Sequence, residues 1–220
     1  MNTDLAALAL DWRDAGRRVA IATVVETWGS APRPVGSQMV IAEDGAMEGS
    51  VSGGCVEGAV VLEAQEALGM GQMRLLEYGV SDDDAFAVGL ACGGNICVLV
   101  EPVGAALPVQ VLRELAARHA GRVPVAYVVN LESGARQVVG ADAFPDRFMT
   151  GRSGIEPEGQ TFVAIHNPRL RMVIVGAVHI AQPLDMMART CGYEVFVVDP
   201  RGAFATPERF PNTRILVDWP

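Results

Sequence analysis

A strand–helix–strand pattern over residues 170–199 most restricts the fold that this chain can adopt. Residues 172–175 form an apolar strand, 180–190 have helical spacing, and Glu194–Val198 is a second strand. This order predicts two parallel strands joined by a crossover helix, as in the first half of a dinucleotide-binding domain. Residues 214–217 add one more expected strand. Because a doubly wound domain has five or six strands, we expect a partial Rossmann-like domain, either truncated or completed by association.

The residues before this unit predict a different architecture. Expected strands lie at 18–27, Gln38–Ala42, 47–52, 73–78, 96–100, 123–130, 137–140 and 162–166, and expected helices at 4–17, 56–68 and 108–119. Residues 148–157 are polar and rich in glycine, which favours a loop. The fold class is therefore α/β, with an N-terminal mixed α/β domain at 1–167 and a partial Rossmann-like βαβ domain at 168–220, and Asn167, Pro168 and Arg169 are the expected linker.

Composition excludes several classes of function. The net charge of −9 argues against general affinity for nucleic acid or anionic membranes. All 17 basic residues are arginines, which excludes a lysine-dependent phosphate loop and Schiff-base catalysis. No apolar run reaches membrane-spanning length and no secretory signal is visible, so we expect a cytoplasmic protein with free thiols.

Two cysteines are flanked by glycines. Cys55 follows Ser52, Gly53 and Gly54 at the expected start of a helix, where unpaired N–H groups favour anions and thiolates. Cys92 precedes Gly93 and Gly94. Both cysteines are candidates to bind a metal or a sulfur-bearing ligand, and the alternative for each is a small buried residue beneath a tight turn.

The other candidate residues also allow both a functional and a purely structural interpretation. The loop at 27–36 offers Ser30 and Arg33 for phosphate or pterin oxygens, and its alternative is an ordinary exposed turn. Cys97 and Cys191 are expected in the core. The acidic run at 82–84 is expected to be a turn or helix cap, with cation binding as the lesser alternative. His119, His166 and His179 have no zinc-ligand spacing.

The partial Rossmann-like domain carries its own candidates. Gly176 and His179 lie at the expected phosphate-binding turn, and Asp199 lies where an acidic residue would meet a ribose hydroxyl. Val178 stands where glycine normally lets the backbone approach a pyrophosphate, which weakens the prediction of nucleotide binding.

Four segments together resemble the xanthine dehydrogenase accessory protein family (XdhC/CoxI). Members have Thr-x-Gly-Ser-Ala-Pro-Arg-Pro-x-Gly, Gly-Ser-x-Ser-Gly-Gly-Cys-x-Glu, Cys-Gly-Gly and Gly-Ala-Gly-His-x-Ala, which correspond here to residues 27–36, 49–57, 92–94 and 176–181. This chain departs from the family at Trp28, where arginine is frequent, and at Val178, which replaces the middle glycine of the last motif.

The resemblance implies a maturation factor for molybdenum hydroxylases, a chaperone more than a catalyst. Such a factor binds the molybdenum cofactor (molybdopterin), supports its sulfuration with a cysteine desulfurase, and delivers it to an apo molybdenum hydroxylase of the xanthine dehydrogenase or carbon monoxide dehydrogenase type. We also expect a homodimer. The candidate cofactor-binding residues are Ser30, Arg33, Gly36, Ser52, Gly53, Gly54, Cys55, Glu57, Cys92, Gly93, Gly94, Gly176, His179 and Asp199.

Two other functions stay open from the sequence. An NAD(P)-dependent oxidoreductase would use the C-terminal βαβ unit, and Asp199 favours it whereas Val178 opposes it. A non-catalytic docking module would recruit a partner through the exposed strand edges of the unfinished sheet.

Overall fold

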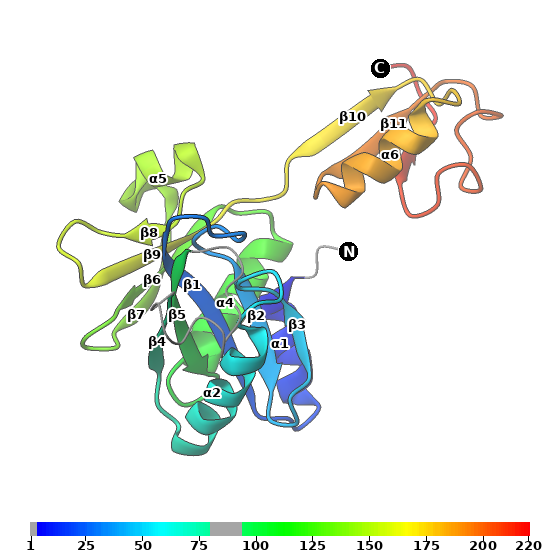
Figure 1. The fold of residues 1–220 in the computed structure, drawn as a ribbon. Coiled ribbons are helices and arrows are strands. Elements are labelled where there is room, and N and C mark those ends of the chain that lie inside the picture. The colour runs from blue at the N-terminus through cyan, green and yellow to red at the C-terminus, as the bar shows by residue number, and fades with distance from the viewer. Residues whose placement is uncertain (1–3, 80–93) are drawn as a thin grey trace. The chain divides into compact units, whose positions relative to one another are not determined.

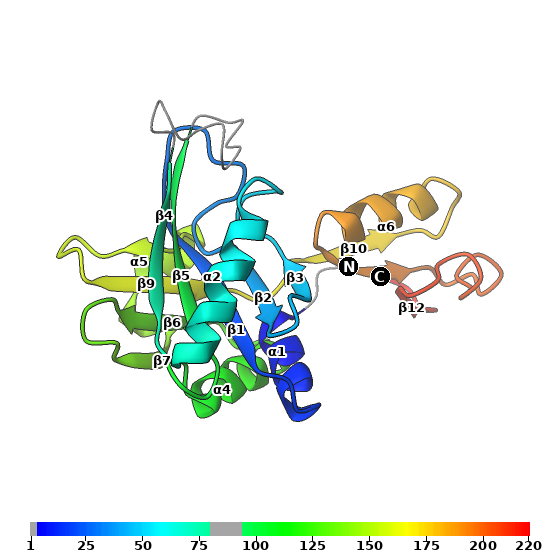
Figure 2. The same ribbon diagram turned by 60° about the horizontal axis from the view of Figure 1, so that its bottom comes forward.

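The structure of the chain is a computed structural model that describes residues 4–79 and 94–220. The chain divides into two compact units, with the division between Asn167 and Pro168. The N-terminal unit contains two antiparallel sheets with helices, and the C-terminal unit contains a small parallel sheet with one helix (Figures 1 and 2). The expected fold class, a mixed α/β domain followed by a Rossmann-like βαβ domain, is confirmed.

The larger sheet of the N-terminal unit has the order β3-β2-β1-β5-β4, with every neighbouring pair antiparallel. Its strands are β1 (Val19–Trp28), β2 (Gln38–Ala42), β3 (Met47–Gly49), β4 (Arg74–Tyr78) and β5 (Asn95–Pro102). Successive side chains of a strand point to opposite faces, so Ala20 and Ala22 join one core cluster while Val19 and Ile21 join another. The sheet is therefore buried on both faces.

Helix α2 (Glu57–Met70) covers one face of this sheet, as Figure 2 shows. Its buried residues Val60, Ala64 and Ala67 recur at helical spacing and pack against β1, β2 and β5. The sequence predicted that Gly69 and Gly71 end this helix, and the helix continues through Gly69. It stops at Gly71, whose φ of 70° places it in the left-handed conformation that commonly ends helices.

Helices α1 (Leu5–Asp14) and α4 (Val109–Ala120) and a second sheet build the core on the opposite face. The second sheet has the order β7-β6-β9-β8, with strands β6 (Val125–Asn130), β7 (Arg136–Gly140), β8 (Gly154–Ile155) and β9 (Thr161–His166). Leu112, Tyr127 and Phe162 are buried in this shared core. The two sheets are thereby joined through one hydrophobic cluster.

The loop expected at 148–157 is only partly a loop. A short 3₁₀ helix, η1 (Ala141–Ala143), is followed by α5 (Pro145–Thr150), and β8 then pairs with β9. Pro145 supplies a helical φ at the first turn, and Gly151, at φ 65°, ends the helix. The six-residue helix is too short to show a helical hydrophobic period, which explains why the sequence did not predict it.

The C-terminal unit has the predicted strand–helix–strand order. Strands β10 (Arg171–Val175), β11 (Glu194–Val198) and β12 (Arg214–Leu216) are parallel, in the order β10-β11-β12, and α6 (Ala181–Thr190) packs against β10 and β11. Ile174, Val195 and Val197 form the core beneath α6. Among the described residues, this sheet is one half of a doubly wound arrangement.

Candidate functional site: three motif loops of the N-terminal unit

The loop between β3 and α2 is organised by the carboxylate of Glu57, the first residue of α2. Four consecutive backbone N–H groups and two serine hydroxyls donate hydrogen bonds to it. The backbone donors are those of Val51 (3.2 Å), Ser52 (2.9 Å), Gly53 (3.0 Å) and Gly54 (2.8 Å), and the hydroxyls are those of Ser50 (2.7 Å) and Ser52. The helix thus supplies the anion that its own N-terminal loop surrounds.

Ser52 satisfies the remaining donors of this loop. Its Oγ accepts hydrogen bonds from the N–H groups of Cys55 and Val56, both at 3.0 Å. The sequence-based expectation of unpaired N–H groups at this helix start is therefore wrong for residues 51–56. The physical reason is local: a carboxylate only a few residues along the chain reaches these donors at little entropic cost. An external anion would have to displace Glu57 to use them.

These hydrogen bonds also hold Glu57 in its charged form. Burial raises the pKa of this carboxyl, but the hydrogen bonds from Ser52 and Ser50 outweigh burial and lower the pKa from 4.5 to about 2. Ser52 and Glu57 are both buried, whereas Gly53 and Gly54 are exposed. The loop is therefore a rigid turn with a buried ionic centre and an exposed glycine tip.

The thiols of the chain lie in contrasting surroundings. Cys55 is half-buried and packs against the cluster beneath α2, so it combines partial access with a fixed position. Cys97 is buried in β5, as expected, and burial raises the pKa of its thiol to about 11. Cys191 is exposed, so the expectation of a core residue is wrong: it is the C-cap residue of α6, beyond Ala188, the last residue that the helix buries.

Three motif segments that are distant in sequence lie side by side in the N-terminal unit. A Cβ atom on Gly94 would stand 2.7 Å from the carbonyl oxygens of both Trp28 and Ser30. A Cβ atom on Gly53 would stand 3.7 Å from Pro32. The loop at 28–36 therefore lies between the glycine loop and Gly94, close to both. Cys92 and Gly93 lie outside the described residues, as does the acidic run at 82–84.

The remaining candidates of the 28–36 loop occupy different positions. Ser30 and Arg33 are exposed. Gly36 has a φ of 90°, and its N–H donates to the Val24 carbonyl at 2.8 Å. A Cβ atom on Gly36 would stand 2.6 Å from the Ser153 hydroxyl, so only glycine fits without a shift of that side chain. Gly36 shapes the base of the loop, and Ser30 and Arg33 offer its polar groups to solvent.

A Gly94→Ala substitution is expected to separate the loop at 28–36 from β5, because the added methyl group overlaps two carbonyl oxygens that belong to backbone. We expect a loss of roughly 1–3 kcal/mol in the free energy of unfolding and faster hydrogen exchange at residues 28–31. Urea denaturation and peptide-level hydrogen exchange measure the two effects. Gly58→Ala, on an open face of α2 with no heavy atom near its Cβ position, is the control: it is expected to raise the free energy of unfolding by up to about 1 kcal/mol and to leave hydrogen exchange at residues 28–31 unchanged.

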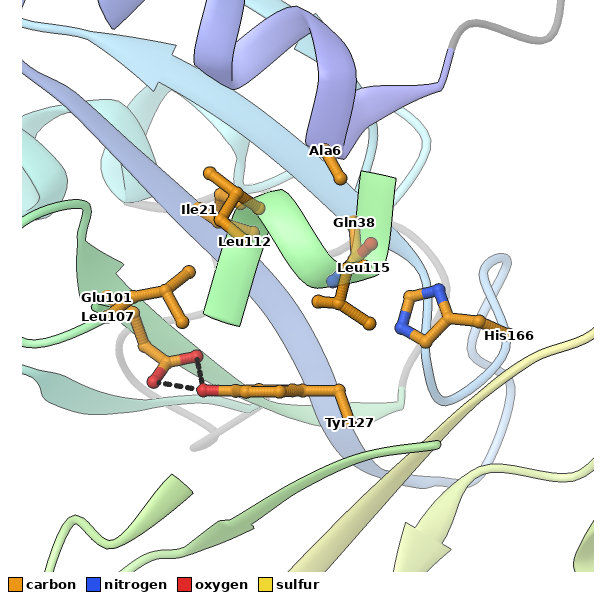
Figure 3. A pocket seen from close by; sticks show the side chains of 9 residues that line it. All are labelled: Ala6, Ile21, Gln38, Glu101, Leu107, Leu112, Leu115, Tyr127 and His166. Carbon is orange, nitrogen blue, oxygen red and sulfur yellow. Dashed lines mark hydrogen bonds between the residues drawn. The ribbon is translucent and has the colours of Figure 1, made fainter. Parts of the chain in front are cut away.

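An interior cavity lies in the same unit but not among these loops (Figure 3). Glu101 is fully buried, and its carboxylate accepts hydrogen bonds from the Tyr127 hydroxyl (2.8 and 3.0 Å) and from Arg136 Nε (2.6 Å). His166 lies at the other end of the lining, where burial, and then the proximity of His119, lowers its pKa to about 4. The sequence reasoning missed this cluster, because β5, β6, β7 and β9 meet only in the folded unit.

Two of the three histidines are brought together despite their distance in sequence. The ring centroids of His119 and His166 are 4.9 Å apart, and His119 Nδ1 lies 3.2 Å from the carboxylate of Asp4, which caps α1. Within residues 4–79 and 94–220, His, Cys, Asp and Glu form no group of three that could hold a metal ion.

The C-terminal candidates surround the turn after β10. Asp199 is buried, and its carboxylate accepts hydrogen bonds from the Ala177 N–H (2.8 Å), the Arg201 N–H (2.9 Å) and the Arg201 guanidinium (2.9 and 2.8 Å). The Arg201 guanidinium, followed by these backbone donors, lowers the pKa of Asp199. Gly176 has a φ of 100° and His179 is exposed. The Asp199 carboxylate thus fixes the turn. These hydrogen bonds occupy the carboxylate oxygens that would otherwise accept from a ribose hydroxyl.

A segment of each unit matches the model of a known protein family. Residues 12–79 match the XdhC and CoxI family, and residues 172–217 match the XdhC Rossmann domain. The chain belongs to the XdhC/CoxI family, as its motifs indicated. Among the described residues, no helix combines the length and the hydropathy that crossing a membrane requires.

Two known proteins and one crystal structure are similar to this chain over most of its length. The molybdenum cofactor insertion chaperone PaoD of Escherichia coli is 32% identical over 203 residues, which are 92% of this chain and 59% of PaoD. A Bacillus subtilis protein described as a probable xanthine dehydrogenase component is 27% identical, over 98% of this chain and 68% of that protein. The crystal structure of a xanthine dehydrogenase from Bacillus halodurans superposes with a TM-score of 0.76 at 25% identity, over 97% of this chain and 68% of that one. The chain thus spans about three fifths of the length of PaoD.

Proposed function

We propose that this chain binds the molybdenum cofactor as cargo during the maturation of a molybdenum hydroxylase. The observation that carries the proposal is the proximity of the 28–36 loop to both Gly53 and Gly94, which makes three family motifs neighbours in space. The similarity to a protein described as a molybdenum cofactor insertion chaperone supports the same role.

Two side chains of these loops suit two different parts of the molybdenum cofactor. Molybdopterin carries a phosphate, and molybdenum accepts soft sulfur ligands. The exposed guanidinium of Arg33 suits the phosphate, and the half-buried thiol of Cys55 suits the metal or a transferable sulfur. The backbone donors of residues 51–56 do not take part, because Glu57 and Ser52 accept them. In this proposal, Glu57 positions Cys55 and makes no contact with the cargo.

The partners follow from that cargo. We propose delivery to an apo-enzyme of the xanthine dehydrogenase or carbon monoxide dehydrogenase type, sulfuration with a cysteine desulfurase, and a homodimer as the acting form. The chain acts as a chaperone in the cytoplasm and not as a catalyst. An NAD(P)-dependent oxidoreductase is the weaker alternative, because the Asp199 carboxylate is already bound by Arg201 and Ala177.

Cofactor retention by purified protein tests the proposal. The chain is co-expressed with the cofactor biosynthesis genes, and molybdenum and oxidised pterin are measured per polypeptide. We expect Cys55→Ser and Arg33→Gln to reduce retention by about tenfold, which corresponds to the loss of one charge-assisted contact or one ligand. Cys191→Ser removes the exposed thiol of the other unit and is expected to retain the cofactor fully. Wild-type retention in both loop variants would remove these residues from the proposal.

A further inference from the structure

The imidazole of His166 lies where three elements of the N-terminal unit meet. His166 is the last residue of β9, and it lines the cavity of Figure 3 together with Ala6 of α1 and Leu115 of α4. Its Nε2 is closed off from solvent, and none of the residues that the structure describes forms a hydrogen bond with it. This position suits a neutral ring, because a charged imidazolium needs an acceptor or water at each of its N–H groups.

Two titratable side chains approach His166 from the helices. The ring centroid of His119, in the last turn of α4, lies 4.9 Å from that of His166. His119 Nδ1 lies 3.2 Å from the carboxylate of Asp4, which also accepts hydrogen bonds from two N–H groups of the first turn of α1. Burial raises the pKa of Asp4, but these hydrogen bonds outweigh burial and hold that pKa below 3.8. The carboxylate on this side of the cluster therefore already has partners in both helices.

A second ionic group lines the opposite end of the same cavity (Figure 3). The Glu101 carboxylate of β5 accepts hydrogen bonds from the Tyr127 hydroxyl and from Arg136 Nε, so it already has its partners. The remaining polar side chain of the lining, that of Gln38 in β2, is a neutral amide. A positive charge on His166 would therefore lie in the interior without a free carboxylate among the residues that line the cavity.

These surroundings make the cluster more stable at neutral than at acidic pH. Burial, followed by the proximity of His119, lowers the pKa of His166 from 6.5 to about 4, and the charge of Asp4 opposes the shift only in part. Once the cluster opens, the imidazole regains its ordinary pKa and binds a proton at a pH at which the closed form does not. The closed form is therefore favoured in full above about pH 6.5, and this preference is lost as the pH falls towards 4.

We propose that His166 is an acid-sensitive latch, which in its neutral state holds the N-terminal end of α1 and the C-terminal end of α4 against β9 and which releases them when the cluster takes up a proton. The cluster is built for this, because Asp4 caps α1, His119 lies in the last turn of α4 and His166 ends β9. The division between the two units follows Asn167, so the chain leaves the N-terminal unit directly after the latch. The latch uses no residue of the motif loops and does not depend on cofactor binding.

Peptide-level hydrogen exchange of the purified chain between about pH 7 and 4.5 tests the latch, with rates corrected for the intrinsic effect of pH. In the wild-type chain, we expect the protection of residues 5–14, 116–120 and 161–166 to fall about tenfold for each pH unit between about 6 and 4.5, because opening takes up one proton. His166→Phe keeps a ring at this position and removes the proton site, so we expect its protection to lose that dependence. All other titratable groups are the same in the two proteins and affect both alike.

A control variant and a second measurement complete the test. His179→Phe changes the exposed histidine of the other unit and is expected to keep the wild-type dependence on pH. Should His166→Phe not fold, an NMR titration of the wild-type imidazole protons, assigned with His119→Phe and His179→Phe, still decides: we expect His166 to stay neutral down to about pH 5. Titration of His166 near pH 6.5, wild-type protection of the three segments that does not change with pH, or the same change in His166→Phe overturns the proposal.

Discussion

A Glu57→Ala substitution is expected to lower the free energy of unfolding by about 3 kcal/mol, one of the two largest effects that we expect in this chain. The substitution leaves the N–H groups of Val51, Ser52 and Gly54 without their acceptor, and those of Val51 and Ser52 are buried. A buried donor without an acceptor costs the full penalty of its desolvation. Urea denaturation of the two proteins measures the difference.

The same variant is expected to release Cys55. Its N–H donates to the Ser52 hydroxyl oxygen, which is itself held by Glu57, so the loop loses both restraints together. We expect faster alkylation of Cys55, followed by peptide mass spectrometry, with unchanged alkylation of the exposed Cys191. Glu66→Ala on the solvent side of α2 removes an exposed partner of Arg74 and is expected to cost less than about 1 kcal/mol. Equal losses in the two variants would contradict the special role of Glu57.

The pH dependence of stability provides a second measure of Glu57. The pKa of this carboxyl is about 2 in the folded chain, against an ordinary value of 4.5. A depressed pKa contributes stability that is present above pH 4.5 and is lost as the pH falls towards 2. We therefore expect the wild-type chain to lose more stability than Glu57→Gln over that interval. Parallel stability curves for the two proteins would show that the carboxylate is not held in its charged form.

The sequence predicted those parts of the fold that depend on local pattern. Strands β2 and β11 have the predicted bounds, because apolar runs flanked by turn residues define them. Helix α5 and strand β8 were missed, because six and two residues are too few for a hydrophobic period. Gly69 did not end α2, since one glycine within a packed helix costs only about 1 kcal/mol.

The sequence predicted less of the candidate site than of the fold. The motifs named the residues of the loops, and the contact of Gly94 with Trp28 and Ser30 arises from the pairing of β1 with β5, which brings their ends together. The pairing of Glu57 with the loop donors could have been anticipated, because an acidic side chain in the first turn of a helix often binds preceding N–H groups. Glu101, Tyr127 and Arg136 carried no local signal, since Glu101 and Arg136 lie just outside the expected strands at 96–100 and 137–140, and Tyr127 lies within an apolar strand pattern.

An Arg136→Met substitution is expected to lower the free energy of unfolding by about 3–5 kcal/mol. Arg136 and Glu101 have side chains that are 8% and 1% exposed, and they join β7 of one sheet to β5 of the other. Without the guanidinium, the Glu101 carboxylate stays buried with the Tyr127 hydroxyl as its remaining partner in the network. Burial already raises the pKa of Glu101, and we expect a further rise in the variant, because the positive charge that opposes the shift is gone.

The double variant Glu101→Met, Arg136→Met tests why Arg136→Met is destabilising. It distinguishes the cost of leaving the Glu101 charge buried without its partner from the cost of losing the ion pair itself. Methionine fills similar volume without a charge, so we expect the double variant to be more stable than Arg136→Met alone, although the Tyr127 hydroxyl loses its acceptor at a cost of about 1 kcal/mol. Arg18→Met, in an exposed pair with Glu43, is expected to cost less than about 1 kcal/mol. If the double variant were less stable than Arg136→Met, an unpaired buried charge would not explain the loss in the single variant. If the double variant is also at least as stable as the wild-type chain, the ion pair orients the strands of the core without a net gain in stability, and apolar packing between the sheets holds the unit together.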